Sequence, residues 1–361
     1  MTEDPVSAGF DPERLNRITD HLNENFIENG KIIGCQTLVA RRGQLAYFKS
    51  LGLADRERNH PVNEDTIFRI YSMSKPITSV ALMQLYEKGL FQLNDPIHRV
   101  LKDWRDLRVW VSGESNFETK DPLRPLTFRH LLSHTGGLTY GGGAHPVDKA
   151  YSNAGLREEK GETLSSFAQK LGQIPLRYDP GEAWLYSYST DVCGHLVEVL
   201  SGKPFDLYLQ EEIFEPLGMV DTGFTVPNSH VSRFAANYGR QPDKSLQLID
   251  DPADSTYLQP KSFFSGGGGL VSTTSDYWRF SEMLRRGGEL DGKRILGPRT
   301  IELMRRNHLS DNRDLAGLAI GAFSETAYEG IGFGLGFAST LDTVDAGQFG
   351  AQDFFWGGAA S

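Results

Sequence analysis

The sequence predicts an α+β fold, in which an antiparallel sheet flanked by helices is joined to a mostly helical lobe. Two observations favour this class: strand-like segments occur near both ends of the 361-residue chain, and the long middle section has helical periodicity with few strand signals. We therefore expect a discontinuous α/β domain from residues 1–68 and 262–361, and a helical domain from residues 69–261. A cleft between two such lobes is a favoured place for a functional site.

The first elements of the chain are a predicted helix and a hairpin. Asp11-Pro12 supplies a helix cap followed by a proline at the first helical position, and apolar residues repeat at helical spacing from Leu15 to Phe26. Residues 33–40 and 45–51 have strand character, and the four residues between them predict a hairpin turn.

The rest of the chain predicts helices in the middle and strands near the end. The predicted helices are 76–89, 126–132, 163–171, 191–200 and 275–286, and the predicted late strands are 332–339 and 353–356. The glycine run Gly266–Gly269 is flanked by apolar residues, so we interpret it as a loop where backbones pass closely. We expect the first and the last strands to share one antiparallel sheet.

Composition excludes several classes of function. Hydrophobic residues make up 39% and charged residues 23% of the chain, as in ordinary globular proteins. The net charge of −10 argues against a nucleic-acid partner and against docking on an anionic membrane surface. Cys35 and Cys193 lie amid apolar neighbours, which favours two buried free thiols over a disulfide and excludes a thiolate zinc site. The acidic, polar N-terminus is unlike a signal peptide, and no apolar run could span a bilayer, so we expect a cytoplasmic protein.

The segment IYSMSKPITSV, residues 70–80, contains a serine and a lysine three residues apart. Because proline is tolerated only in the first turn of a helix, Pro76 predicts a helix start close to Ser72. Ser72 and Lys75 then lie on one face, where a buried lysine can take the serine proton. A chain of this size contains about one Ser-x-x-Lys by chance. Lys75 is nevertheless the only lysine with a serine at that spacing, and its neighbours are too apolar for a solvated surface.

Two further stretches add to this pair. Tyr186 lies on a predicted turn entering a helix, from which its phenol can relay a proton if nearby cations hold it partly ionised. The alternative is aromatic packing under a loop. Gly357 and Gly358 follow a predicted strand and Trp356, and they allow another backbone or a ligand to approach closely. The alternative there is a simple bulge or turn.

Together these stretches resemble the serine β-lactamase and penicillin-binding-protein superfamily, and within it the class C-like esterases called family VIII carboxylesterases. The likeness runs in order from about Phe10 to the last residue. Its segments are Arg69–Pro76, Leu131–Leu138 with its His-Thr-Gly-Gly turn, Trp184–Ser187, Gly266–Ser272, Gly287–Lys293 and Trp356–Gly358. Each segment is a weak signal alone, but the ordered set is specific.

The resemblance implies a role for each matching residue. Ser72 would be the acylated nucleophile, with Lys75 and Tyr186 as its proton relay. The backbone N–H groups of Ser72 and Ala359 would form an oxyanion hole for the tetrahedral intermediate. The residues expected to bind substrate are Tyr140 on one wall and Trp356, Gly357 and Gly358 on the other. His134 would be structural, and the resemblance implies neither a metal nor a cofactor.

This sequence departs from the lactamase pattern at two motifs. The tyrosine motif Tyr-x-Asn has a second tyrosine in its third place, so Tyr188 competes with Tyr186 for the relay. Trp356-Gly357-Gly358 stands where lactamases carry Lys-Thr-Gly, and it lacks the lysine that helps hold the substrate carboxylate. Loss of that cation disfavours anionic β-lactams and favours neutral esters.

The sequence thus predicts a serine esterase that cleaves short-chain acyl esters of small molecules through an acyl-enzyme. Alternatives on the same scaffold are a β-lactamase, a D-amino-acid peptidase and an acyltransferase. A non-catalytic binding or assembly relative is a further alternative. An α/β-hydrolase site is disfavoured because no Gly-x-Ser-x-Gly motif occurs. Related proteins continue beyond the third motif with strands and a helix, so we expect residues beyond Ser361, or less readily a split chain or partner. Acyl and alcohol preference and oligomeric state do not follow from the sequence.

Overall fold

The computed structural model describes residues 2–156, 161–321, 328–350 and 353–359. The α-helices are α1 Pro12–Leu22, α2 Ser74–Glu87, α3 Phe128–Leu132, α4 Pro146–Asn153, α5 Leu164–Leu171, α6 Ser189–Ser201, α7 Phe205–Leu209, α8 Glu215–Leu217, α9 Thr274–Arg285, α10 Pro298–Arg305 and α11 Leu315–Leu318. Shorter 3-10 or π turns are η1 Asn23–Ile27, η2 Tyr71–Met73, η3 Ile97–Arg99, η4 Lys102–Trp104, η5 Gln210–Phe214, η6 Asn228–Arg233, η7 Thr256–Leu258 and η8 Ser310–Asn312.

The strands form several small antiparallel sheets. They are β1 Gly34–Arg41, β2 Gln44–Asp55, β3 His60–Pro61, β4 Ile67–Arg69, β5 Val109–Ser112, β6 Glu118–Lys120, β7 Asn237–Arg240, β8 Leu246–Asp250, β9 Val271–Thr273, β10 Glu289–Leu290, β11 Lys293–Arg294, β12 Ile331–Phe333, β13 Ala338–Thr340 and β14 Phe354–Phe355. The described strands pair as β1-β2-β3, β4-β9, β5-β6, β7-β8, β10-β11 and β12-β13-β14. The α+β class is confirmed.

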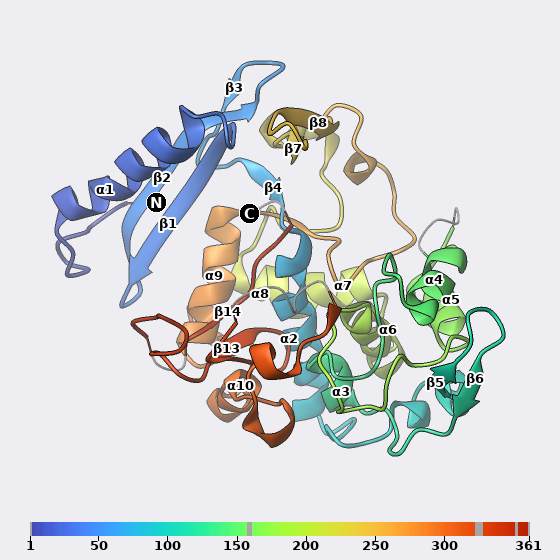
Figure 1. Cartoon of the computed structure of the whole chain (residues 1–361). Helices are drawn as coiled ribbons and strands as arrows, with labels where there is room; N and C mark the ends of the chain where they lie inside the picture. The colour runs from blue at the N-terminus through green and yellow to red at the C-terminus, as the bar shows by residue number, and fades with distance from the viewer. Residues whose placement is uncertain (1, 157–160, 322–327, 351–352, 360–361) are drawn as a thin grey trace.

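The N-terminal helix and hairpin form as the sequence predicts. The Asp11 side chain accepts the backbone N–H of Glu13 at 2.9 Å and caps α1. The turn between β1 and β2 has positive φ at Arg42 and Gly43, which suits the twist of a two-residue hairpin. Figure 1 shows α1 lying along this long hairpin at one side of the molecule, with α9 beside it.

Helix α2 runs through the middle of the molecule and is buried on every side (Figure 1). Every residue from Ser74 to Leu85 is buried, and α2 packs closely against α6. A helix that is apolar all round belongs in a protein core. The other predicted helices form close to their expected bounds, because Thr127, Thr163 and Thr273 cap them and Gly202 ends α6 with φ of +70°.

Two predictions about the late strands were wrong. The first and last strands do not share a sheet in the described structure, because β12, β13 and β14 are two or three residues long and pair only with each other. Residues 332–339 do not form one strand, because the chain turns between β12 and β13. Gly336 takes φ of +101° at this turn, and a Cβ there would lie 2.1 Å from Ser79 Oγ. The turn thus depends on a contact with α2 that sequence spacing does not reveal. The division into domains 1–68 with 262–361 and 69–261 stays a prediction.

Both cysteines are free, as expected, and Cys193 is buried, but Cys35 is only partly buried, which corrects the prediction of two buried thiols. Burial also raises the pKa of the Cys35 thiol above its ordinary value. Within the described ranges, no helix combines the length and the apolar character that crossing a bilayer requires.

Replacing Gly336 should destabilise the fold more than replacing another glycine with positive φ. We expect Gly336→Ala to lower the free energy of unfolding by about 2–4 kcal/mol, because it adds overpacking against Ser79 to backbone strain. Gly89 has φ of +75° and open space around its Cβ position, so Gly89→Ala should cost only about 1–2 kcal/mol. Urea unfolding of both variants measures the difference, and equal losses would contradict the packing of Gly336 on Ser79.

Candidate active site

The serine of interest lies on a tight turn between a strand and the buried helix. Strand β4 pairs with β9, and the chain then enters α2 through η2, which contains Ser72. Pro76 is the third residue of α2, so the helix begins two residues after Ser72, close to where the proline predicts. Tyr71, directly before Ser72, has φ of +42°, a conformation that is strained for a tyrosine. Its hydroxyl oxygen accepts a hydrogen bond from the Asn237 side-chain amide at 2.6 Å, and this bond holds the strained residue in place.

Lys75 is almost completely buried and points at Ser72. Its side chain lies on the first turn of α2 and is 1% exposed. Lys75 Nζ lies 3.2 Å from Ser72 Oγ and donates to the carbonyl oxygen of Gly267 at 2.5 Å. The structure therefore brings together the pair that the i, i+3 spacing predicts. An amine this close to a serine hydroxyl is placed to exchange a proton with it.

Tyr186 lies against both members of this pair. Ser72 lies near enough to Tyr186 to affect the pKa of its phenol, and Lys75 Nζ stands 4.5 Å from the centre of its ring. Trp356 Nε1 donates to the Tyr186 hydroxyl at 3.2 Å. Burial raises the pKa of Tyr186 to about 12 and outweighs the lowering effects of Ser72 and Trp356. This direction differs from the expectation of partial ionisation, because burial disfavours the charged phenolate.

The competing tyrosine lies in a different environment. Tyr188 packs among aromatic rings of the helical part, with ring centres 5.2 Å from Phe167 and 6.4 Å from Tyr151. Tyr140 lies between the two candidates, 5.3 Å from the Tyr186 ring and 4.5 Å from the Tyr188 ring. Lys75 Nζ is also 5.6 Å from the Tyr140 ring. Tyr140 thus borders the Ser72–Lys75–Tyr186 group, where the resemblance places a wall of the site.

The third motif reaches the turn that contains Ser72 from the other side. Trp356 contacts Tyr186, and Gly358 lies so close to the turn that a Cβ there would be 2.5 Å from the carbonyl oxygen of Ile70. The two-glycine signal therefore marks a close approach of backbone to backbone, as one of its two interpretations predicts. Gly357 and Ala359 are exposed, and Ala359 follows directly after this contact. The oxyanion role of the Ser72 and Ala359 N–H groups stays a prediction.

His134 belongs to the packing beneath the site. It is buried, with Nδ1 3.2 Å from Ser187 Oγ and Nε2 3.4 Å from Thr190 Oγ1. Burial, and to a lesser degree the electrostatic effect of the neighbouring Lys75, holds the pKa of His134 well below its ordinary value. Its ring contacts the Tyr186 ring, with centres 5.0 Å apart. A neutral imidazole with these neighbours supports Tyr186, in line with the structural role that the resemblance implies.

The sequence analysis did not single out two groups that the structure links to Lys75, one directly and one through the backbone of Gly267. One is the carbonyl of Gly267, in the predicted glycine loop, and the other is the carboxylate of Asp191, in the first turn of α6. Asp191 Oδ1 accepts Ser265 Oγ at 2.5 Å and the Gly267 N–H at 3.2 Å. Asp191 looked like an ordinary acid at a helix start. The glycine run was the one signal that could have pointed to this contact, since it indicates a close approach.

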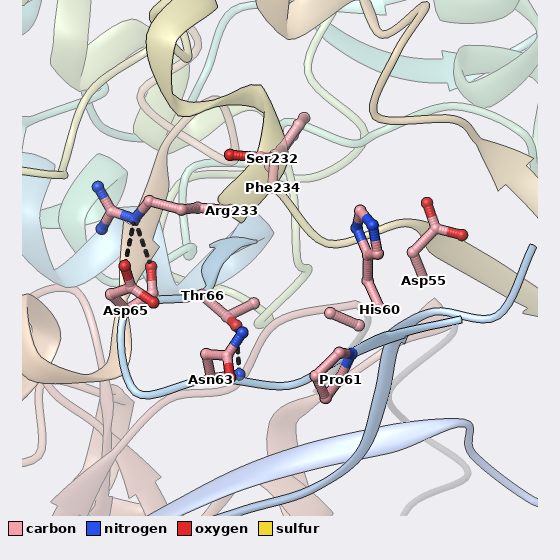
Figure 2. A pocket seen from close by; sticks show the side chains of 10 residues that line it. Asp55, His60, Pro61, Asn63, Asp65, Thr66, Ser232, Arg233 and Phe234 are labelled. Carbon is pink, nitrogen blue, oxygen red and sulfur yellow. Dashed lines mark hydrogen bonds and ion pairs between the residues drawn. The ribbon is translucent and has the colours of Figure 1, made fainter. Parts of the chain in front are cut away.

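A separate hollow of about 240 Å³ lies away from Ser72, between β3 and η6. Figure 2 shows His60 and Asp55 at one side of it and Arg233 paired with Asp65 at the other. Arg233 also forms an ion pair with Asp221 at 2.5 Å. Because the Arg233 guanidinium is already paired with two carboxylates, it is not available to bind an anionic ligand in this hollow. Nor does the described part of the chain bring three or more His, Cys, Asp or Glu side chains together as a metal site.

Comparisons with known proteins agree with this geometry. The family model described as Beta-lactamase matches residues 16–359. Esterase EstB of Burkholderia gladioli is 31% identical over 98% of this chain and 88% of its own length. The solved structure of EstCE1, a hydrolase with promiscuous acyltransferase activity, superposes with a TM-score of 0.79 at 29% identity, covering 96% of this chain and 88% of its own. Unliganded simvastatin synthase, LovD, from Aspergillus terreus gives a TM-score of 0.76 at 26% identity, with the same coverage of both chains.

The matches extend over nearly the whole chain and include both ends of the site, from the Ser72 turn to Ala359. They confirm the resemblance that the ordered motifs carry. The chain therefore belongs to the β-lactamase family, and within it to the serine esterase-like enzymes.

Proposed function

We propose that this chain hydrolyses short-chain acyl esters through an acyl-enzyme on Ser72, with Lys75 and Tyr186 moving the protons. The observation that carries the proposal is the position of Lys75 Nζ, which lies 3.2 Å from Ser72 Oγ and 4.5 Å from the centre of the Tyr186 ring. A serine hydroxyl bonded to an adjacent base is the arrangement that makes a weak nucleophile reactive. This would place the chain among the family VIII carboxylesterases.

In the proposed acylation step, Ser72 Oγ attacks the ester carbonyl and its proton passes to the neutral Lys75 amine. The N–H groups of Ser72 and Ala359 bind the developing oxyanion. The tetrahedral intermediate then collapses, and the alcohol leaves with a proton from the Tyr186 phenol, which regains one from the Lys75 ammonium. A neutral phenol suits this role, because it already holds the proton that the leaving group needs.

Deacylation follows the same path in reverse. Water takes the place of the alcohol, gives its proton to the Tyr186–Lys75 relay and attacks the acyl group. Collapse of the second intermediate returns the proton to Ser72 Oγ and releases the acid. The relay thus returns to its starting state after each turnover, and neither a metal nor an organic cofactor takes part in the proposed steps.

The residue in place of the lactamase lysine supports a preference for neutral esters. Trp356 occupies that place, and its indole N–H is already bonded to the Tyr186 hydroxyl. An indole offers no positive charge to a substrate carboxylate, whereas a lysine offers a charge-assisted hydrogen bond. The rings of Tyr140 and Trp356 also pack against the Tyr186 ring, close to the Ser72–Lys75 pair, which supports a small acyl group.

Acyl transfer to an alcohol is a second candidate, favoured by the likeness to EstCE1, a hydrolase with promiscuous acyltransferase activity. An alcohol that can leave the tetrahedral intermediate can also attack the acyl-enzyme in place of water. The two candidates therefore share one acylation step and differ only in the acceptor.

Removing the proposed nucleophile should abolish turnover. We expect Ser72→Ala to lower kcat for p-nitrophenyl acetate and butyrate by about 10³-fold or more, because no acyl-enzyme can form. Ser79→Ala is the matched control, since Ser79 lies on the same helix and its buried hydroxyl has no hydrogen-bond partner in the described structure. Equal background hydrolysis by the parent and Ser72→Ala, with no labelling of Ser72 by a serine-reactive phosphonate, would point to a non-catalytic relative.

The two tyrosines should respond differently to loss of the hydroxyl. Tyr186→Phe should lower kcat by about 10²-fold or more while retaining the ring that stacks on Trp184, because it removes only the proton relay. Tyr188→Phe should leave kcat within about threefold. Steady-state kinetics with p-nitrophenyl butyrate measure both. The reverse order of effects would transfer the relay to Tyr188.

An added alcohol should divert the acyl group. With p-nitrophenyl butyrate and 1-butanol, we expect the parent to form butyl butyrate as well as butyric acid, and Ser72→Ala to form neither above background. Gas chromatography of the products measures this partition. Butyric acid as the sole product at every butanol concentration would assign the chain to hydrolysis alone.

A further inference from the structure

Asp191 is a buried acid whose position the proposed mechanism does not yet explain. It is 0% exposed, on the first turn of α6. Its Oδ1 atom accepts two hydrogen bonds, but its Oδ2 atom is also buried and has no hydrogen-bond partner in the described structure. Burying a carboxylate with one oxygen unsatisfied costs free energy, so such a residue usually has a role that offsets the cost.

The two hydrogen bonds of Asp191 hold one loop, Ser265–Leu270, here called the glycine loop. Asp191 Oδ1 accepts Ser265 Oγ at 2.5 Å and Gly267 N at 3.2 Å. The carbonyl of the same Gly267 accepts Lys75 Nζ at 2.5 Å. A single residue of backbone therefore joins the buried carboxylate to the buried amine.

The glycine loop is held on its opposite side by the first turns of α2. Thr78 Oγ1 donates to the carbonyl of Gly266 at 2.8 Å, and the Leu270 N–H donates to Ser74 Oγ at 3.2 Å. Thr78, Ser74 and Lys75 thus bind the loop from one helix, while Asp191 binds it from another. The carbonyl of Gly267 lies between these two sets of contacts.

Close packing leaves this carbonyl little freedom. A Cβ on Gly267 would lie 2.5 Å from Asp191 Oδ2 and 3.3 Å from the Tyr140 hydroxyl, so only glycine fits there. A Cβ on the next residue, Gly268, would have its nearest neighbour 3.7 Å away, which is ordinary contact. Neither glycine has a positive φ in the range that strains L-residues. The two positions therefore differ in whether a side chain reaches Asp191.

We propose that Asp191 is a positioning residue for Lys75: through the backbone of Gly267 it fixes the acceptor that aims Lys75 Nζ at Ser72 Oγ. The inference rests on the proposed function, in which Lys75 takes the serine proton. Without Asp191 the glycine loop keeps its contacts to α2 but loses its link to α6. The Gly267 carbonyl can then turn away, and Lys75 Nζ loses the hydrogen bond that orients it. Proton transfer suffers from even a small displacement of the base.

The test combines kinetics with a signal from Lys75 itself. Asp191→Asn keeps an acceptor for the loop and should lower kcat for p-nitrophenyl butyrate about tenfold, whereas Asp191→Ala should lower it about a hundredfold. Gly267→Ala pushes the loop off Asp191 and should lower kcat at least tenfold. In each variant KM should stay within about twofold, because substrate contacts remain. In parallel, the Lys75 13Cε–1H signal of 13C-lysine protein, assigned by its absence from Lys75→Arg, should shift in all three variants.

Two matched controls separate positioning from general destabilisation. Gly268→Ala makes the same change one residue later and should keep kcat within about twofold. Asp276→Asn replaces another buried acid in the first turn of a helix, one bonded to Thr222 and Asp221, and should not move the Lys75 signal. The inference would be overturned if Asp276→Asn and Asp191→Asn lost the same kcat for the same fall in melting temperature.

An unchanged Lys75 signal in both Asp191→Asn and Gly267→Ala would also overturn the inference, whatever the rates. The signal does not depend on turnover. If the parent fails to hydrolyse esters, the proposed function fails, and the Lys75 signal still decides whether Asp191 positions that side chain.

Discussion

The hydrogen bonds of the buried Lys75 amine constrain the rest of the site. Nζ lies between Ser72 Oγ and the carbonyl of Gly267, in a position with 1% exposure. A buried amine needs acceptors, since leaving it unpaired costs free energy comparable to that of several good packing contacts. One acceptor is the Ser72 side chain, and the other is a backbone carbonyl that reaches the first turn of α2. This requirement explains why a strand, a helix start and a glycine loop, far apart in sequence, converge on one turn.

Close approach of backbones is the second constraint, and it acts on both sides of the nucleophile. Gly267 lies against Asp191 on one side, and Gly358 lies against the Ile70 carbonyl on the other. A side chain at Gly267 would collide with the Asp191 carboxylate, and a side chain at Gly358 would collide with the carbonyl of Ile70, the residue before Tyr71. Glycine backbone thus packs against a carboxylate on one side of the site and against a backbone carbonyl on the other.

Local signals predicted much of this structure. Capping residues such as Thr127 and Thr163 gave the helix starts, and Ser72, Lys75 and Pro76 gave the pair and the beginning of α2, because all of these act over three or four residues. Contacts across long stretches of sequence could not be read the same way. The turn at Gly336 depends on Ser79, and Asp191 meets a residue 76 positions away at Gly267. A polar residue in the first turn of a helix has the same local sequence signal whether it only caps the helix or contacts a distant loop.

The raised pKa of Tyr186 indicates which residue takes the first proton in the proposed relay. Burial raises the pKa of the phenol to about 12, and the donors Trp356 and Ser72 do not offset that effect. A phenol that keeps its proton cannot be the first base, so the serine proton must go to Lys75. Lysine can accept it only while its amine points at Ser72 Oγ, and the amine has a competing acceptor in the Gly267 carbonyl. That carbonyl holds the amine on the line of transfer and also stabilises the ammonium that transfer creates. The Gly267 carbonyl is therefore as much a part of the proposed proton path as the tyrosine.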